Sequence, residues 1–122
     1  MRRIYAKPLR VAVGVGMCST AKAEDVSESV KLAMRAVGLD PRRADAIALP
    51  SIRGGHPSVE ILRAEFADVT FFDVDKARAA GGGSVCEGLA KLAAGGPCRL
   101  ILRKASFRPH VTVAVAEGAP WE

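Results

Sequence analysis

The stretch VAVGVGMCST, residues 11–20, decides the fold of this 122-residue chain. β-Branched residues alternate along its first half, which predicts a strand over residues 9–15. Gly14 and Gly16 then break the apolar run into a small polar loop, and a helical pattern starts near Lys22. A strand that feeds a glycine loop ahead of a helix leaves backbone N–H groups free for a ligand, and open α/β proteins bind ligands at such points.

The rest of the chain repeats this alternation of strand and helix. Hydrophobic periodicity predicts, in order, helix 22–37, strand 46–52, helix 57–66, strand 69–73, helix 84–94, strand 99–103 and strand 110–116. The last two strands are too close in sequence for a crossover helix, so we expect an antiparallel hairpin. The order predicts a three-layer α/β/α fold with a mostly parallel five-stranded sheet and an antiparallel edge strand. We expect one domain over residues 1–122, with residues 1–8 as a basic N-terminal extension.

Composition narrows the class of protein. Apolar residues make up 49% of the chain and charged residues 25%, as in ordinary globular domains. No apolar run reaches the roughly 18 residues of a spanning helix, and the basic N-terminus lacks the apolar core of a signal peptide. We therefore expect a cytoplasmic protein with no membrane partner. Three cysteines without CxxC spacing and two scattered histidines predict no metal site, and we expect no cofactor.

The net charge of +5 is unevenly placed. Residues 1–23 and 88–116 carry basic side chains and no acid, so they would form one positive surface if they meet in the fold. Such a surface suits an anionic partner; the alternative is a solvated surface that only aids solubility. One Trp, one Tyr and four Phe provide few stacking platforms, so no nucleic-acid partner is expected.

A dinucleotide fingerprint is incomplete in this sequence. Ser19 stands where the G-x-G-x-x-G pattern requires its third glycine, and the acid expected after the second strand is missing. Arg53 lies near that point, and an arginine suits a 2′-phosphate. A nucleotide- or phosphate-binding module that uses the loop of Gly14 and Gly16 therefore remains an alternative.

Three predicted loops would meet at the carboxyl edge of the sheet if the first strand is central and the fourth lies beside it. They span residues 14–20, 81–84 and 103–110. The first two precede helices and offer N–H groups, whereas the third offers cationic side chains. This cleft suits a ligand with several carboxylates; the alternative for the glycines at 81–83 is a flexible turn. The candidate ligand-binding residues are Gly14, Gly16, Ser19, Thr20, Gly82, Gly83, Ser84, Lys104 and Arg108.

Three residues are candidates for catalysis if the chain is an enzyme. Glu87 would act as the acid, Cys18 as the nucleophile and Lys104 as the electrostatic stabiliser. Each has a structural alternative. Glu87 completes an S-x-x-E capping box with Ser84, Cys18 is a loop thiol without chemistry, and Lys104 is an exposed surface residue.

The segments VAVGVGMCST, GGGSVCEGLAKLAAGG and LILRKASFRPHVTVAVA, in this order, resemble the CobE / CbiG C-terminal domain family of cobalamin biosynthesis over residues 9–117. The family's S-V-x-E helix start falls on Ser84 to Glu87, its lysine after the fourth strand on Lys104, and its last-strand threonine on Thr112, which the resemblance adds to the ligand-binding candidates. The chain departs from the family at residues 53–56, where a lysine followed by acids is common.

The resemblance implies a role in building the corrin ring. The chain would bind or act on a polycarboxylated precorrin or corrin intermediate, either as a carrier or in ring contraction with hydrolytic release of a two-carbon fragment. A catalytic form would be a hydrolase of the cobalt-precorrin-5A hydrolase type. CbiG proteins carry a further upstream domain, so this chain resembles the stand-alone CobE form of the aerobic route, with other corrin-pathway enzymes as further partners.

Overall fold

A computed structural model describes residues 9–53, 55–66, 68–74 and 84–119. The N-terminal extension and the glycines at 81–83 lie outside these residues. The elements of the described part are β1 (Arg10–Met17), α1 (Ala23–Ala36), η1 (Pro41–Arg43), β2 (Ala46–Pro50), η2 (Ser51–Arg53), α2 (Pro57–Glu65), β3 (Thr70–Val74), α4 (Val85–Ala94), β4 (Cys98–Ala105) and β5 (Val111–Gly118).

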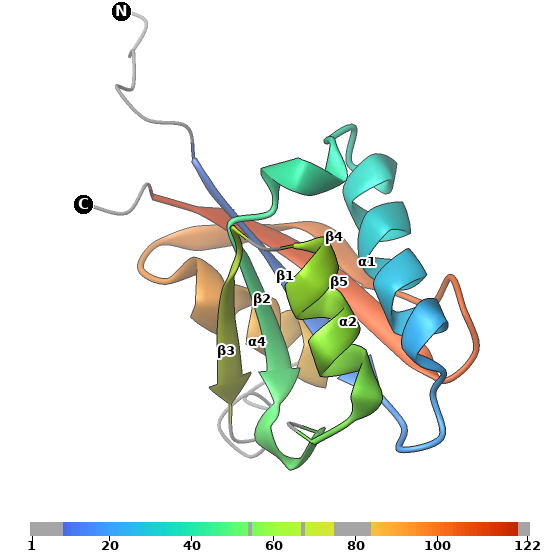
Figure 1. The fold of residues 1–122 in the computed structure, drawn as a ribbon. Coiled ribbons are helices and arrows are strands. Elements are labelled where there is room, and N and C mark those ends of the chain that lie inside the picture. The colour runs from blue at the N-terminus through green and yellow to red at the C-terminus, as the bar shows by residue number, and fades with distance from the viewer. Residues whose placement is uncertain (1–8, 54, 67, 75–83, 120–122) are drawn as a thin grey trace, which may run out of the picture.

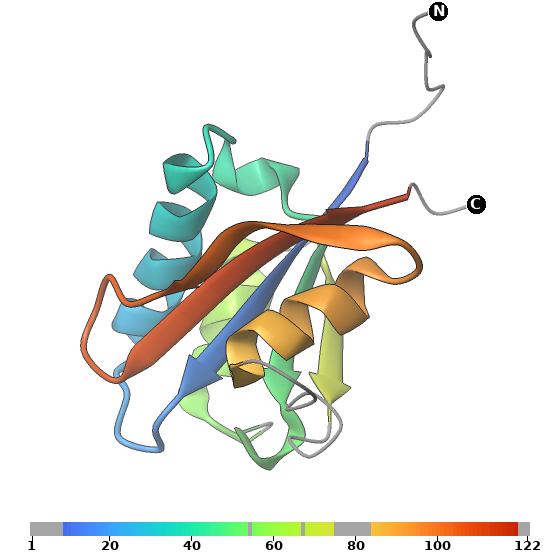
Figure 2. The same ribbon diagram turned by 180° about the vertical axis from the view of Figure 1, so that it is seen from behind.

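The strands form one five-stranded sheet between two helical layers. Their order is β3-β2-β1-β5-β4, with parallel pairing among β1, β2 and β3. The β4–β5 hairpin is antiparallel and forms one edge of the sheet. Helices α1 and α2 cover one face and α4 covers the other (Figures 1 and 2). The predicted three-layer α/β fold with a mixed sheet is confirmed.

The neighbour of the first strand differs from the prediction. We expected β4 beside β1, but β5 lies there and pairs with β1 along its whole length, from Arg10 opposite Gly118 to Met17 opposite Val111. The crossover through α4 places β4 one position further out, and the returning strand of the hairpin fills the gap. The turn between β4 and β5 therefore still lies near the carboxyl end of β1 (Figure 2).

The predicted loop over residues 14–20 begins too early. β1 continues to Met17, so Gly14 and Gly16 both lie inside the strand. Gly14 stands opposite Ala48 of β2 and Ala114 of β5 in the sheet. A Cβ atom on Gly14 would overlap the carbonyl oxygen of Cys86 and lie 2.5 Å from the backbone nitrogen of Ala90. Glycine is needed there because the backbone of α4 lies directly on the strand.

Small side chains make up most of the buried contact between α4 and the sheet. This face buries alanines of the strands against small residues and Leu89 of α4. On the opposite face, valines, Ile47 and Leu49 of the strands pack against side chains of α1 and α2, among them Met34 of α1. Cys86 lies in this core, while Cys98 is half-buried at the start of β4. The close approach of α4 brings its first turn to the carboxyl end of β1.

Candidate functional site

A pocket of about 310 Å³ lies where the carboxyl ends of β1 and β2 meet the first turn of α4 and the turn between β4 and β5. This edge is the topological switch point of the sheet, because α1 and α4 leave it on opposite faces (Figures 1 and 2). The residues that line the pocket are Gly16, Met17, Cys18, Pro50, Ile52, Val85, Ser106, His110, Val111 and Thr112.

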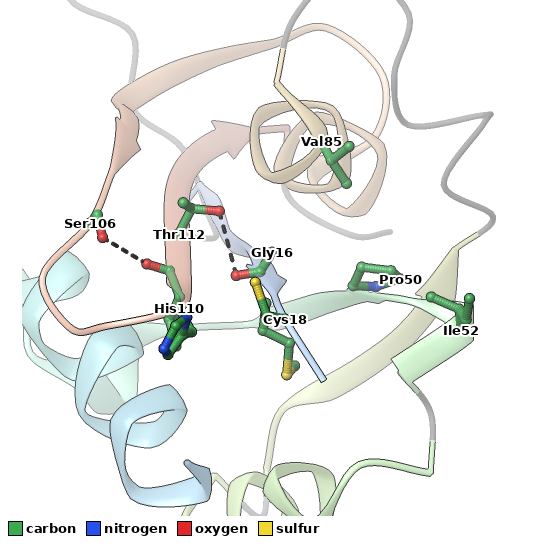
Figure 3. A pocket seen from close by; sticks show the side chains of 10 residues that line it. Gly16, Cys18, Pro50, Ile52, Val85, Ser106, His110 and Thr112 are labelled. Carbon is green, nitrogen blue, oxygen red and sulfur yellow. Dashed lines mark hydrogen bonds between the residues drawn. The ribbon is translucent and has the colours of Figure 1, made fainter. Parts of the chain in front are cut away.

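The pocket has one apolar wall and one polar wall. Figure 3 shows Pro50, Ile52 and Val85 on one side, and Ser106, His110 and Thr112 on the other. Ile52 contributes an unusual surface, because 73% of this large apolar side chain is exposed. An apolar wall with an exposed Ile52 that faces polar groups is the arrangement expected for a flat ligand with polar substituents.

The polar wall is fixed by hydrogen bonds between two loops. The backbone N–H of Cys18 donates to the carbonyl oxygen of His110 over 3.0 Å, which ties the end of β1 to the hairpin turn. The Ser106 hydroxyl donates to the carbonyl oxygen of Val111 over 3.0 Å and closes the turn itself (Figure 3). These bonds hold His110 at a φ of 64°, in the left-handed region.

The floor of the pocket is a close contact between Gly16 and Thr112. The Thr112 hydroxyl donates to the carbonyl oxygen of Gly16 over 3.4 Å. A Cβ atom on Gly16 would lie 2.6 Å from that hydroxyl oxygen. Gly16 therefore makes room for the threonine side chain, and its role is packing between paired strands.

Both carboxylate oxygens of Glu87 bind backbone N–H groups. One accepts from Ser84 over 3.4 Å, and Ser84 returns the contact by accepting from the Glu87 backbone over 3.3 Å, so the predicted capping box is present. The other accepts from the backbone N–H of Lys104 over 3.0 Å. The Lys104 bond, followed by that of Ser84, lowers the pKa of Glu87. This environment favours the carboxylate and opposes the proton that a general acid must carry.

The structure brings some of the predicted ligand-binding and catalytic residues together. Gly16, Cys18 and Thr112 line the pocket. Lys104 and Arg108 are exposed on the hairpin that supplies the polar wall of the pocket. Ser84 is the N-cap of α4, and the first residue of that helix, Val85, lines the pocket. The remaining candidates lie elsewhere: Gly14 under α4, Ser19 and Thr20 in the loop after β1 but not in the lining, and Gly82 and Gly83 outside the described residues.

Sequence reasoning missed most of the pocket lining. The predicted strand over residues 46–52 correctly includes Pro50 but not Ile52, because the strand ends at Pro50 and a helical turn follows over Ser51–Arg53. The sequence predicts a strand that begins at residue 110, whereas β5 begins at Val111 and His110 takes a left-handed backbone that depends on a tertiary hydrogen bond. An apolar residue two positions after a strand-ending proline, in the turn that follows it, is a signal that could have identified Ile52.

Within the described residues, no group of three or more His, Cys, Asp or Glu side chains is placed to hold a metal ion. None of the helices described is long and apolar enough to cross a membrane.

Comparison with known proteins identifies the family. Residues 11–116 match the family model described as "Cobalamin synthesis G C-terminus". The chain belongs to this family. Family membership makes it a cobalamin biosynthesis domain and confirms the resemblance seen in the sequence. No match was found among the curated proteins.

Solved structures share the fold over nearly the whole chain. A cobalamin biosynthesis protein G homolog from Sulfolobus solfataricus is 25% identical with a TM-score of 0.72 over 91% of this chain, which spans 37% of that protein. CobE from the cobalamin (vitamin B12) biosynthetic pathway is 18% identical with a TM-score of 0.79, covering 95% of both chains. Cobalamin biosynthesis protein chiG from Agrobacterium tumefaciens is 23% identical with a TM-score of 0.74, covering 90% of this chain and 99% of that one.

Proposed function

We propose that this family member binds a polycarboxylated precorrin or corrin intermediate in the pocket at the carboxyl end of β1. The observation that carries the proposal is the pairing of an apolar wall, on which Ile52 is exposed, with a polar wall in a cobalamin biosynthesis domain. A corrin-type ring is flat and apolar on its faces and carries carboxylates around its rim. Its face suits Pro50, Ile52 and Val85, and its carboxylates suit the cationic hairpin.

The cations of the hairpin are available for such a ligand. Lys104 and Arg108 are exposed, and neither side chain forms an ion pair within the described residues. Among the described residues Lys104 is engaged through its backbone N–H, by Glu87, and no partner there holds its ammonium group, which can meet a carboxylate. Exposed charges of this kind steer an anionic ligand and set its orientation.

The size of the pocket favours holding the intermediate over enclosing it. About 310 Å³ is at the lower end of the range for small-molecule sites, so a macrocycle would lie with one face covered and its far edge in water. A carrier that hands the ring to other corrin-pathway enzymes needs this accessibility. The commitment of Glu87 to backbone N–H groups also supports a carrier over a hydrolase.

The phosphate-binding alternative has lost its structural basis. It required the N–H groups of Gly14 and Gly16 to face a ligand from a loop, but both residues lie within β1, between paired strands. The helix that follows, α1, has Lys22 as its N-cap and acids in its first turn, which disfavour a phosphate there.

The proposal is tested by titrating the protein with hydrogenobyrinic acid and following the visible absorption of the ring. We expect a saturable spectral change. The affinity that this titration measures should fall about tenfold in Lys104→Glu, which is equivalent to about 1.4 kcal/mol of binding free energy. Arg35→Glu is the matched control, since Arg35 is exposed in the last turn of α1, at the other end of the sheet. An unchanged spectrum at low salt, or equal weakening in both variants, would contradict the proposal.

A further inference from the structure

The β4–β5 hairpin supplies positive charge to one side of the pocket. None of the residues that line the pocket is a Lys, Arg, Asp or Glu. The hairpin adds three exposed cations, Arg103, Lys104 and Arg108, and residues 88–116 contain no acid. The apolar wall across from the hairpin carries no charge (Figure 3). An anionic ligand in the pocket is therefore attracted toward the hairpin side.

Hydrogen bonds hold the backbone of these cations in a defined place. The carboxylate of Glu87 accepts from the backbone N–H of Lys104 over 3.0 Å. The Ser106 hydroxyl lies 3.4 Å from the carbonyl oxygen of Arg108 and 3.0 Å from that of Val111, across the turn. Cations on a fixed backbone orient a ligand with several carboxylates, because the ligand must turn until its carboxylates meet them.

The pocket covers only part of a corrin-type ring. Its volume of about 310 Å³ is at the lower end of the range for small-molecule sites, so a macrocycle with side chains around its whole rim does not fit inside. The edge of the ring beside the hairpin, the near edge, lies against the protein, whereas the far edge projects into water. Carboxylates on the two edges consequently have different surroundings.

We propose that the site grips its ring by one edge and thereby divides the ring carboxylates into two classes. Those at the near edge pair with the hairpin cations and are withheld from reaction. Those at the far edge stay open to an enzyme that modifies carboxylates, so the protein directs which side chains of the ring react first. This inference rests on the proposed function and adds an activity to it, because a simple carrier protects every carboxylate or none.

The test is a brief amidation of hydrogenobyrinic acid, free and bound, with a water-soluble carbodiimide and ethanolamine. In this reaction a carboxylate and the amine form an amide, while the carbodiimide takes up the elements of water and becomes a urea. A carboxylate that is paired with a cation resists the protonation that its activation requires. We expect one group of neighbouring carboxylates to react about tenfold more slowly in the bound ring, and the others to react at the free-ring rate. NMR and mass spectrometry of the recovered ring assign the positions.

Variants compared at saturating ring connect the protection to the hairpin. Lys104→Gln and Arg108→Gln should each restore the free-ring rate at part of the protected group. Arg35→Gln, an exposed control at the other end of the sheet, should restore none. Protection spread around the whole rim, no protection in a bound ring, or an unchanged pattern in both hairpin variants would overturn the division into two edges alone. The absence of a saturable spectral change with the wild-type protein would overturn the proposed function as well.

Discussion

The carboxylate of Glu87 accepts a hydrogen bond from the backbone N–H of Lys104 over 3.0 Å and so joins the first turn of α4 to the edge strand β4. The register of β4 against β5 shifts twice between Leu100 and Ala105, so this part of the hairpin is irregular. The Glu87 contact holds the end of β4 that contains Lys104. Two residues later the chain reaches Ser106, which belongs to the polar wall of the pocket. The position of the polar wall therefore depends on a helix cap.

Replacement of Glu87 tests this connection. Glu87→Ala removes the acceptor for two backbone N–H groups and should lower the free energy of unfolding by about 1–2 kcal/mol, measured by denaturant titration. Glu60→Ala is the control, because Glu60 is an exposed acid in the first turn of α2. An equal effect of the two substitutions would show that the Lys104 bond adds nothing.

The same contact predicts a pH dependence. The backbone N–H of Lys104 lowers the pKa of Glu87 in the folded protein below its ordinary value of about 4.3. The contribution of Glu87 to stability is therefore complete above that ordinary value and is lost as the pH falls through the lower pKa of the folded state. The difference in unfolding free energy between wild type and Glu87→Gln should shrink below about pH 4. A difference that grows in acid would refute the assignment.

Gly14→Ala should destabilise the fold strongly. The new methyl group would meet the backbone of α4 at Cys86 and Ala90, which cannot move without lifting the helix from the sheet. We expect a loss of about 1–3 kcal/mol or more in denaturant unfolding. Gly55→Ala is the matched control, because a Cβ atom there has no neighbour within 4 Å among the described residues. A tolerated Gly14→Ala would contradict the close contact of α4 with β1.

Gly16 and Thr112 should be energetically coupled. In Gly16→Ala the new methyl group meets the Thr112 hydroxyl at 2.6 Å, whereas Thr112→Ala removes that hydroxyl. The double variant should therefore regain most of the stability that Gly16→Ala loses, by about 0.5–3 kcal/mol relative to the sum of the single changes. Additive losses in the double-mutant cycle would show that the two side chains do not share the floor of the pocket.

Cys18 reports on occupancy of the pocket. Cys18 is exposed in the lining, whereas Cys86 is buried on the face of α4 that packs on the sheet. A thiol reagent should modify Cys18 ahead of Cys86 in the folded protein, and bound hydrogenobyrinic acid should slow that modification. Cys18→Ala identifies the signal by removing it. An unchanged rate of Cys18 modification at saturating ligand would place the ligand elsewhere.

Features set by local sequence were predictable. Neighbouring residues determine the capping box of Ser84 and Glu87, the hairpin of β4 and β5, and the order of strands and helices along the chain. The sheet edge that carries the pocket could be predicted too, because the carboxyl ends of parallel strands share one edge.

Features set by tertiary contacts were not predictable. Gly14 and Gly16 look like a loop in sequence, yet they lie in a strand because α4 and Thr112 occupy the space of their missing side chains. The left-handed backbone of His110 depends on Cys18, which is remote in sequence. The apolar wall joins β2 to α4, and no single segment of the chain carries that pattern.

The central claim is that a carboxylated tetrapyrrole lies between the walls of this pocket. The most direct measurement is a titration of ¹⁵N-labelled protein with hydrogenobyrinic acid, followed by amide chemical shifts. We predict that the shifts concentrate at Cys18, Ile52, Val85 and residues 106–112. Shifts that gather instead at the opposite end of the sheet, around Ala36 and Arg99, or no shifts at a saturating concentration, would contradict the account.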